Sequence, residues 1–149
     1  MTTPLLHELS EPVLAECVER FHGLRGHAPR RGTPFEAYLL DWAHFKRRVA
    51  EAAAECLLHL VPAVRRIYYA ELSEDYAGRD IDLIVELEPT AQDHAATEVE
   101  ETIEAILSKL TEAAGLELRA YTDTPAPFEV HRSDMLEIRP RHLVLLASR

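Results

Sequence analysis

The chain has 149 residues, of which 47% are hydrophobic, and it carries a formal net charge of −10 at pH 7. This length fits one domain with a sizeable core, and the hydrophobic fraction excludes a disordered chain. The acidic excess argues against general nucleic-acid binding, because neutralising phosphates requires clustered lysine and arginine. No stretch approaches the roughly 20 apolar residues that cross a bilayer, so no membrane partner is expected.

The cysteines and the N-terminal residues indicate the cellular compartment of the protein. Cys17 and Cys56 both fall in apolar helical patterns without a CxxC pair, so we expect two reduced core residues. Residues 1–10 carry neither a basic flank nor a long apolar run, and no signal peptide is expected. Together these features predict a cytoplasmic protein.

The N-terminal part, residues 1–63, is expected to be helical. Ser10 can cap a first helix that runs to about His22. A glycine-rich loop follows, whose arginines are expected to be solvated, with anion binding as the alternative. A second helix begins at the capping sequence Thr33-Pro34-Phe35-Glu36 and ends before Pro62.

The second helix would be about 39 Å long at the standard rise, which is long for so small a domain. Its side chains Leu39, Trp42 and Phe45 lie on one side, and we expect a homodimer through them. The basic run at residues 46–48 is expected to form the solvent face of the same helix.

Residues 64–149 are expected to form an α/β core. Alternate residues from Arg79 to Leu87 divide between two faces, as in a strand with one buried face. One face carries Asp80, Asp82, Ile84 and Glu86, and the other carries Ile81, Leu83, Val85 and Leu87. The last strand, rich in leucine and valine, is expected to be buried on both faces. The predicted order is strand, strand, helix, strand and strand, at residues 64–72, 79–87, 90–115, 116–122 and 142–147. The fold class is therefore α+β: one domain, 1–149, with a mixed sheet packed by helices and two additional N-terminal helices.

Two carboxylates stand out in this core. Asp80 and Asp82 occupy alternate positions of one strand, so their Cβ atoms point the same way and lie about 6–7 Å apart. Mg²⁺ takes oxygen ligands and keeps phosphates as co-ligands, so this spacing suits a magnesium site.

The segment Asp80-Ile81-Asp82-Leu83-Ile84-Val85-Glu86-Leu87, preceded by a strand and followed by a helix and another strand, resembles the metal-binding strand of the minimal nucleotidyltransferase fold of the DNA polymerase β type. The resemblance covers roughly residues 64–146. It implies that Asp80 and Asp82 hold Mg²⁺ on a nucleoside triphosphate and that a third carboxylate, on the strand after the helix, completes the site. Glu117 occupies that position.

One part of the family pattern is missing. The family's first strand ends in Gly-Ser, which holds the triphosphate, whereas residues 69–78 here read YAELSEDYAG, and this acidic turn would repel a triphosphate. A triphosphate site needs a positive group near Asp80, and only Arg79 and Arg119 are expected to be available locally. We therefore expect a nucleotidyltransferase-like protein that binds Mg²⁺ weakly and transfers nucleotides slowly or not at all.

Two other interpretations stay open. The first is a non-catalytic, dimeric module with the same fold that acts in interaction or regulation. The second is an unrelated α+β interaction domain, in which Asp80 and Asp82 are solvated carboxylates of a half-exposed strand.

Overall fold

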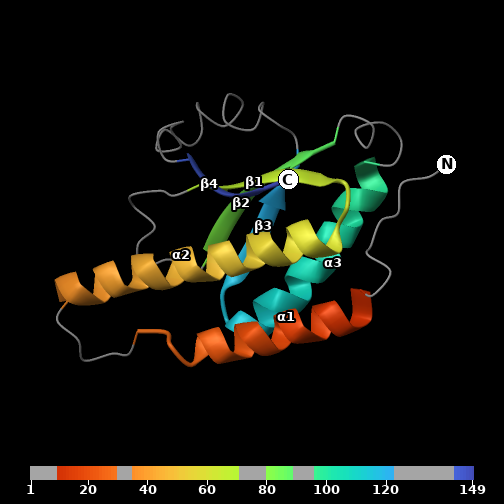
Figure 1. Cartoon of the computed structure of the whole chain (residues 1–149). Coiled ribbons are helices and arrows are strands. Elements are labelled where there is room, and N and C mark those ends of the chain that lie inside the picture. The colour runs from red at the N-terminus through yellow and green to blue at the C-terminus, as the bar shows by residue number, and fades with distance from the viewer. Residues whose placement is uncertain (1–9, 30–34, 71–79, 89–95, 123–142) are drawn as a thin grey trace.

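The computed structural model describes residues 10–29, 35–70, 80–88, 96–122 and 143–149. This part of the chain forms three helices and four strands (Figure 1). In chain order they are α1 (Ser10–Arg25), α2 (Phe35–Leu60), β1 (Val64–Ala70), β2 (Asp80–Leu87), α3 (Ala96–Ala114), β3 (Glu117–Tyr121) and β4 (Leu143–Ser148).

The four strands form one mixed sheet in the order β3-β2-β1-β4. β1 is antiparallel to both β2 and β4, whereas β2 and β3 are parallel and are joined through α3. β2 therefore lies between two other strands of the sheet. The α+β class and the mixed sheet are confirmed.

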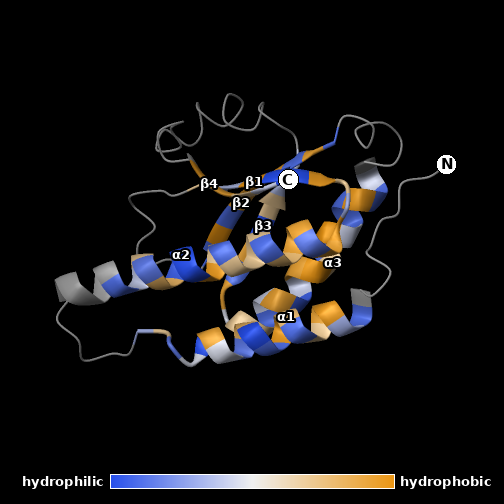
Figure 2. Ribbon diagram, viewed as in Figure 1, coloured by the Kyte–Doolittle hydropathy of each residue, from blue (hydrophilic) through white to orange (hydrophobic). Residues whose placement is uncertain are grey.

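The helices lie together on one side of the sheet (Figure 1). α2 contacts β1 and β4, α3 contacts β3, and α1 contacts the other two helices. Residues of α2 change from polar near its middle to hydrophobic toward its C-terminal end (Figure 2), where it adjoins the sheet. The apolar side of β2 completes this core, and it consists of Ile81, Leu83, Val85 and Leu87, all buried.

The C-terminal ends of α2 and α3 follow local sequence signals. α2 ends at Leu60, two residues before Pro62. α3 stops at Gly115, whose φ of 76° is a conformation that glycine adopts without strain. The predicted helix-capping residues at 33–34 and 90–93 and the acidic turn at 71–78 lie outside the described residues.

Arg149 secures the C-terminal end of α2 from a distant part of the chain. Its guanidinium donates hydrogen bonds to the backbone carbonyl oxygens of Leu58, Val61 and Val64, the last at 2.7 Å. The final carbonyl groups of a helix have no partner within the helix, and a cation there also interacts favourably with the helix dipole. Arg149 thus joins the end of β4 to the junction of α2 and β1.

Three predictions made from the sequence need correction, one about the end of a helix and two about burial. α1 continues to Arg25, three residues past His22, because Gly23 stays helical and the chain turns only at Gly26. Lys46 is 3% exposed and has an interaction partner, so it is not on the solvent face of α2. Among the described strands, β4 lies at the edge of the sheet beside β1, and its Leu145 is 53% exposed, so β4 is not buried on both faces.

The residues that suggested a dimer are largely covered within the chain. Trp42 and Phe45 are 3% and 4% exposed, and their ring centroids lie 5.4 Å apart. The side chain of Leu39 is outside the described residues. A homodimer remains a prediction that these two aromatic residues no longer support. None of the described helices combines the length and the apolar character needed to cross a membrane.

Candidate functional site

The predicted metal ligands lie on the adjacent strands β2 and β3. In the parallel register, Asp80 is opposite Glu117 and Asp82 is opposite Arg119. Paired residues of neighbouring strands share one face of the sheet, and the strands are about 4.8 Å apart. The structure therefore places Asp80, Asp82 and Glu117 on one face of the sheet, opposite the face that carries Ile81, Leu83, Val85 and Leu87.

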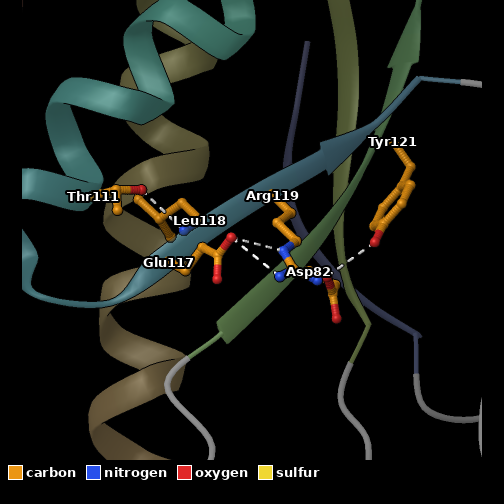
Figure 3. A network of polar contacts seen from close by, with 6 residues as sticks. All are labelled: Asp82, Thr111, Glu117, Leu118, Arg119 and Tyr121. Atoms are coloured by element: carbon orange, nitrogen blue, oxygen red, sulfur yellow. Dashed lines mark hydrogen bonds and ion pairs between the residues drawn. The ribbon is translucent and has the colours of Figure 1, made fainter.

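Arg119 and Tyr121 also belong to this face, and sequence reasoning gave neither of them a place among the site residues. Arg119 donates through Nε to Oε1 of Glu117 at 3.1 Å, and its Nη2 lies 3.1 Å from the same oxygen (Figure 3). Tyr121 donates its hydroxyl to Oδ1 of Asp82 at 3.3 Å (Figure 3). The alternation of Glu117, Arg119 and Tyr121 is the signal that places them on one face.

The carboxylates of this face contribute to raised pKa values of Arg119 and Tyr121. The pKa of Arg119 is raised, first by its hydrogen bond to Glu117 and then by the charges of Glu117 and Asp82, so its guanidinium stays protonated. The pKa of Tyr121 is raised above its ordinary value by partial burial, and next by the charge of Asp82 and the hydrogen bond to it.

The Tyr121 phenol predicts a dependence of stability on alkaline pH. Because its pKa is higher in the folded than in the unfolded chain, it contributes stability below about pH 10, and this contribution is lost as pH rises through the folded-state pKa. Thermal unfolding midpoints should fall less steeply with alkaline pH in Tyr121→Phe than in the wild type. Tyr68→Phe is the control, because Tyr68 lies on β1 and on the same face of the sheet as Tyr121. Parallel curves for Tyr121→Phe and the wild type would show that the contact with Asp82 is absent in solution.

The carboxylates are not arranged as a ready metal site. Within the part of the chain that the structure describes, no three carboxylate, histidine or cysteine side chains converge as metal ligands would. Glu117 is instead paired with Arg119. The three carboxylates supply the oxygen ligands that Mg²⁺ prefers, but using all three requires Glu117 to exchange Arg119 for the cation. This exposed ion pair is worth at most about 1 kcal/mol, so the exchange has a small cost.

A groove beside this face contains a cation that sequence reasoning did not connect with the aspartates. The open groove, with a volume of about 520 Å³, is lined by Asp80 and Glu117 and also by Arg25, Thr111 and Gly115. A Cβ atom at Gly115 would lie 3.2 Å from Nε of Arg25, so the guanidinium rests directly against this glycine. Arg25 reaches the groove because α1 packs against α3.

Arg25 was expected in a solvated loop, and no local pattern indicates its position. Of the two cations expected near the aspartates, Arg79 lies outside the described residues, and Arg119 is the partner of Glu117. Arg25 is therefore the described cation that shares a groove with Asp80. Glu112 lines the same groove, which keeps its overall charge negative.

Comparison with protein-family models, with curated proteins and with solved structures finds no match to this chain. A functional assignment therefore has to come from the arrangement of these side chains.

Proposed function

We propose that this chain is a nucleotidyltransferase-like domain that binds a divalent cation, Mg²⁺ above all, through Asp80, Asp82 and Glu117, and that nucleotide transfer by it is slow or absent. The observation that carries the proposal is the parallel register of β2 and β3, which sets Glu117 beside Asp80. The resemblance assigned the third carboxylate to the strand after the helix, and this register is what allows Glu117 to share a cation with the aspartates.

The connectivity of the sheet supports the same proposal. The aspartate-bearing strand is central, the strand before it is antiparallel, and the strand after α3 is parallel on its other side. This agrees with the succession of strand, strand, helix and strand that carried the resemblance. Asp80 and Asp82 stand at the start of β2, where the groove with Arg25 adjoins the sheet.

The charges of the groove determine the order in which ligands would bind. Asp80, Glu112 and Glu117 line it together with the single cation Arg25 among its described residues. A free triphosphate would be repelled, whereas a bound Mg²⁺ would supply positive charge for phosphate oxygens. Arg25 then offers a guanidinium that can donate two hydrogen bonds to a phosphate. We therefore expect nucleotide binding to depend on the cation.

A second candidate is a non-catalytic interaction or regulatory module. Its support is the Arg119–Glu117 ion pair, which places a guanidinium where a bound cation would neutralise the carboxylates. In such a module, the charged face of the sheet would bind a partner and no nucleotide. Measurements of nucleotide binding with and without cation separate the two candidates.

Binding of a fluorescent nucleoside triphosphate should require Mg²⁺ or Mn²⁺ and should be lost in the double variant Asp80→Asn/Asp82→Asn. Arg25→Ala should weaken it about 10-fold, the effect of losing one charge-assisted hydrogen-bonded contact. Arg20→Ala is the matched control, because Arg20 is on the same helix but pairs with Glu55, away from the groove. Binding that is equal with and without cation, or unchanged in the double variant, would contradict the proposal.

The same preparation tests catalysis. Transfer of label from radiolabelled triphosphates to protein or RNA should be slow or absent in the presence of Mg²⁺. Rapid transfer that disappears in the double variant would show that the metal site is right and that the expected weakness of catalysis is wrong.

A further inference from the structure

A second pair of reactive side chains lies between α1 and α2, away from the carboxylates. Cys17 on α1 and Cys56 on α2 are both free thiols, and both line one open groove of about 370 Å³. Cys17 is half-buried, whereas Cys56 is only 4% exposed. A small molecule in the groove therefore reaches the thiol of Cys17 more readily than that of Cys56.

The two thiols interact with each other. The pKa of Cys56 is raised well above its ordinary range, first by burial and then by the neighbouring thiol of Cys17. An ion pair holds the two helices together at the same level, since Nη1 of Arg20 lies 2.6 Å from Oε2 of Glu55. Arg20 is one helical turn from Cys17, and Glu55 precedes Cys56. α1 and α2 are therefore in contact at the level of the two cysteines.

We propose that Cys17 and Cys56 form a redox modification site, in which a low-molecular-weight disulfide in the groove converts the two thiols into an intramolecular disulfide between α1 and α2. The expectation of two inert core cysteines considered each residue alone. The structure differs because the helix pairing brings residues 39 positions apart in the sequence to one groove, which a sequence without a CxxC motif does not reveal.

The reaction balances in two exchanges. The Cys17 thiolate attacks one sulfur of the small disulfide and expels one small thiolate, which leaves a mixed disulfide on Cys17. Cys56 then loses its proton, which is the slow step because burial raises the pKa of its thiol, and attacks the Cys17 sulfur. This attack expels the second half of the small disulfide as a thiolate, which takes up the proton. Two cysteine protons and two electrons pass to the small disulfide, which leaves as two thiols. Cys17 acts first because it is the more exposed of the two.

The experiment treats the folded full chain with oxidised glutathione and follows intact mass. The wild type should lose about 2 Da, the mass of two hydrogen atoms, and dithiothreitol should restore it. Closing this loop of the chain should raise the thermal unfolding midpoint by about 5–10 °C. Cys56→Ser should instead keep a stable glutathione adduct on Cys17. Cys17→Ser should react far more slowly, because Cys56 is buried.

Three results would overturn the proposal. The first is a wild type that retains the glutathione adduct and does not lose two hydrogen atoms. The second is a disulfide that joins two chains, detected on a non-reducing gel. The third is a folded wild type that does not react although the unfolded chain does. The proposal and its test do not depend on the metal site, so either can fail without the other.

Discussion

Replacing Leu83 by alanine is expected to lower the free energy of unfolding by about 3–4 kcal/mol. Leu83 is fully buried in the middle of β2, where its backbone pairs with Tyr69 on one side and Ala120 on the other. The loss combines the transfer free energy of the removed methyl groups with the cavity that the surrounding core cannot close. Urea unfolding followed by circular dichroism measures it.

Leu145→Ala is the matched control for this prediction. The same substitution on the same sheet removes a side chain that is 53% exposed on the edge strand β4, so a change within about 0.5 kcal/mol is expected. If Leu145→Ala lowers the free energy of unfolding as much as Leu83→Ala does, then β4 is covered in solution and the burial described for the sheet is wrong.

The elements that sequence analysis predicted are those with a strong local signal. The β2 strand was predicted from eight residues of strict alternation, and α3 was predicted to stop at Gly115, where φ is positive. Local patterns predicted the burial of side chains less well where that burial depends on the neighbouring helices and strands. Leucine and valine made β4 look fully buried, but its position at the sheet edge leaves Leu145 exposed. Lys46 looked solvated from its charge alone, yet it is buried with a partner.

The candidate site shows the same limit. Asp80 and Asp82 share a face because they are two residues apart on a strand, which the sequence states directly. Glu117 comes beside Asp80 only through the parallel register of β3 against β2. The position of Arg25 in the groove depends on the packing of α1 against α3, and no pattern near residue 25 indicates it. Contacts of this kind are long-range in sequence and require the fold.

The second large effect is expected from the cation itself. A cation that binds the folded chain and not the unfolded chain stabilises the folded state by mass action. Mg²⁺ at ten times its dissociation constant should stabilise the folded chain by about 1.4 kcal/mol. For a chain of 149 residues, this corresponds to a rise of about 4 °C in the thermal unfolding midpoint. Arg119→Ala should enlarge the rise, because it removes a competing cation and frees Glu117.

The central claim is tested most directly by thermal unfolding of four proteins with and without Mg²⁺: the wild type, Asp80→Asn/Asp82→Asn, Arg119→Ala and Glu86→Gln. Glu86 is the matched control, because it is a carboxylate on the same face of β2 that is paired with Arg66 and lies away from the groove. We predict a rise of about 4 °C in the wild type and in Glu86→Gln, a larger one in Arg119→Ala, and none in the aspartate double variant. Equal shifts in the wild type and the double variant, or no shift in the wild type, would contradict the assignment of a metal site to Asp80 and Asp82.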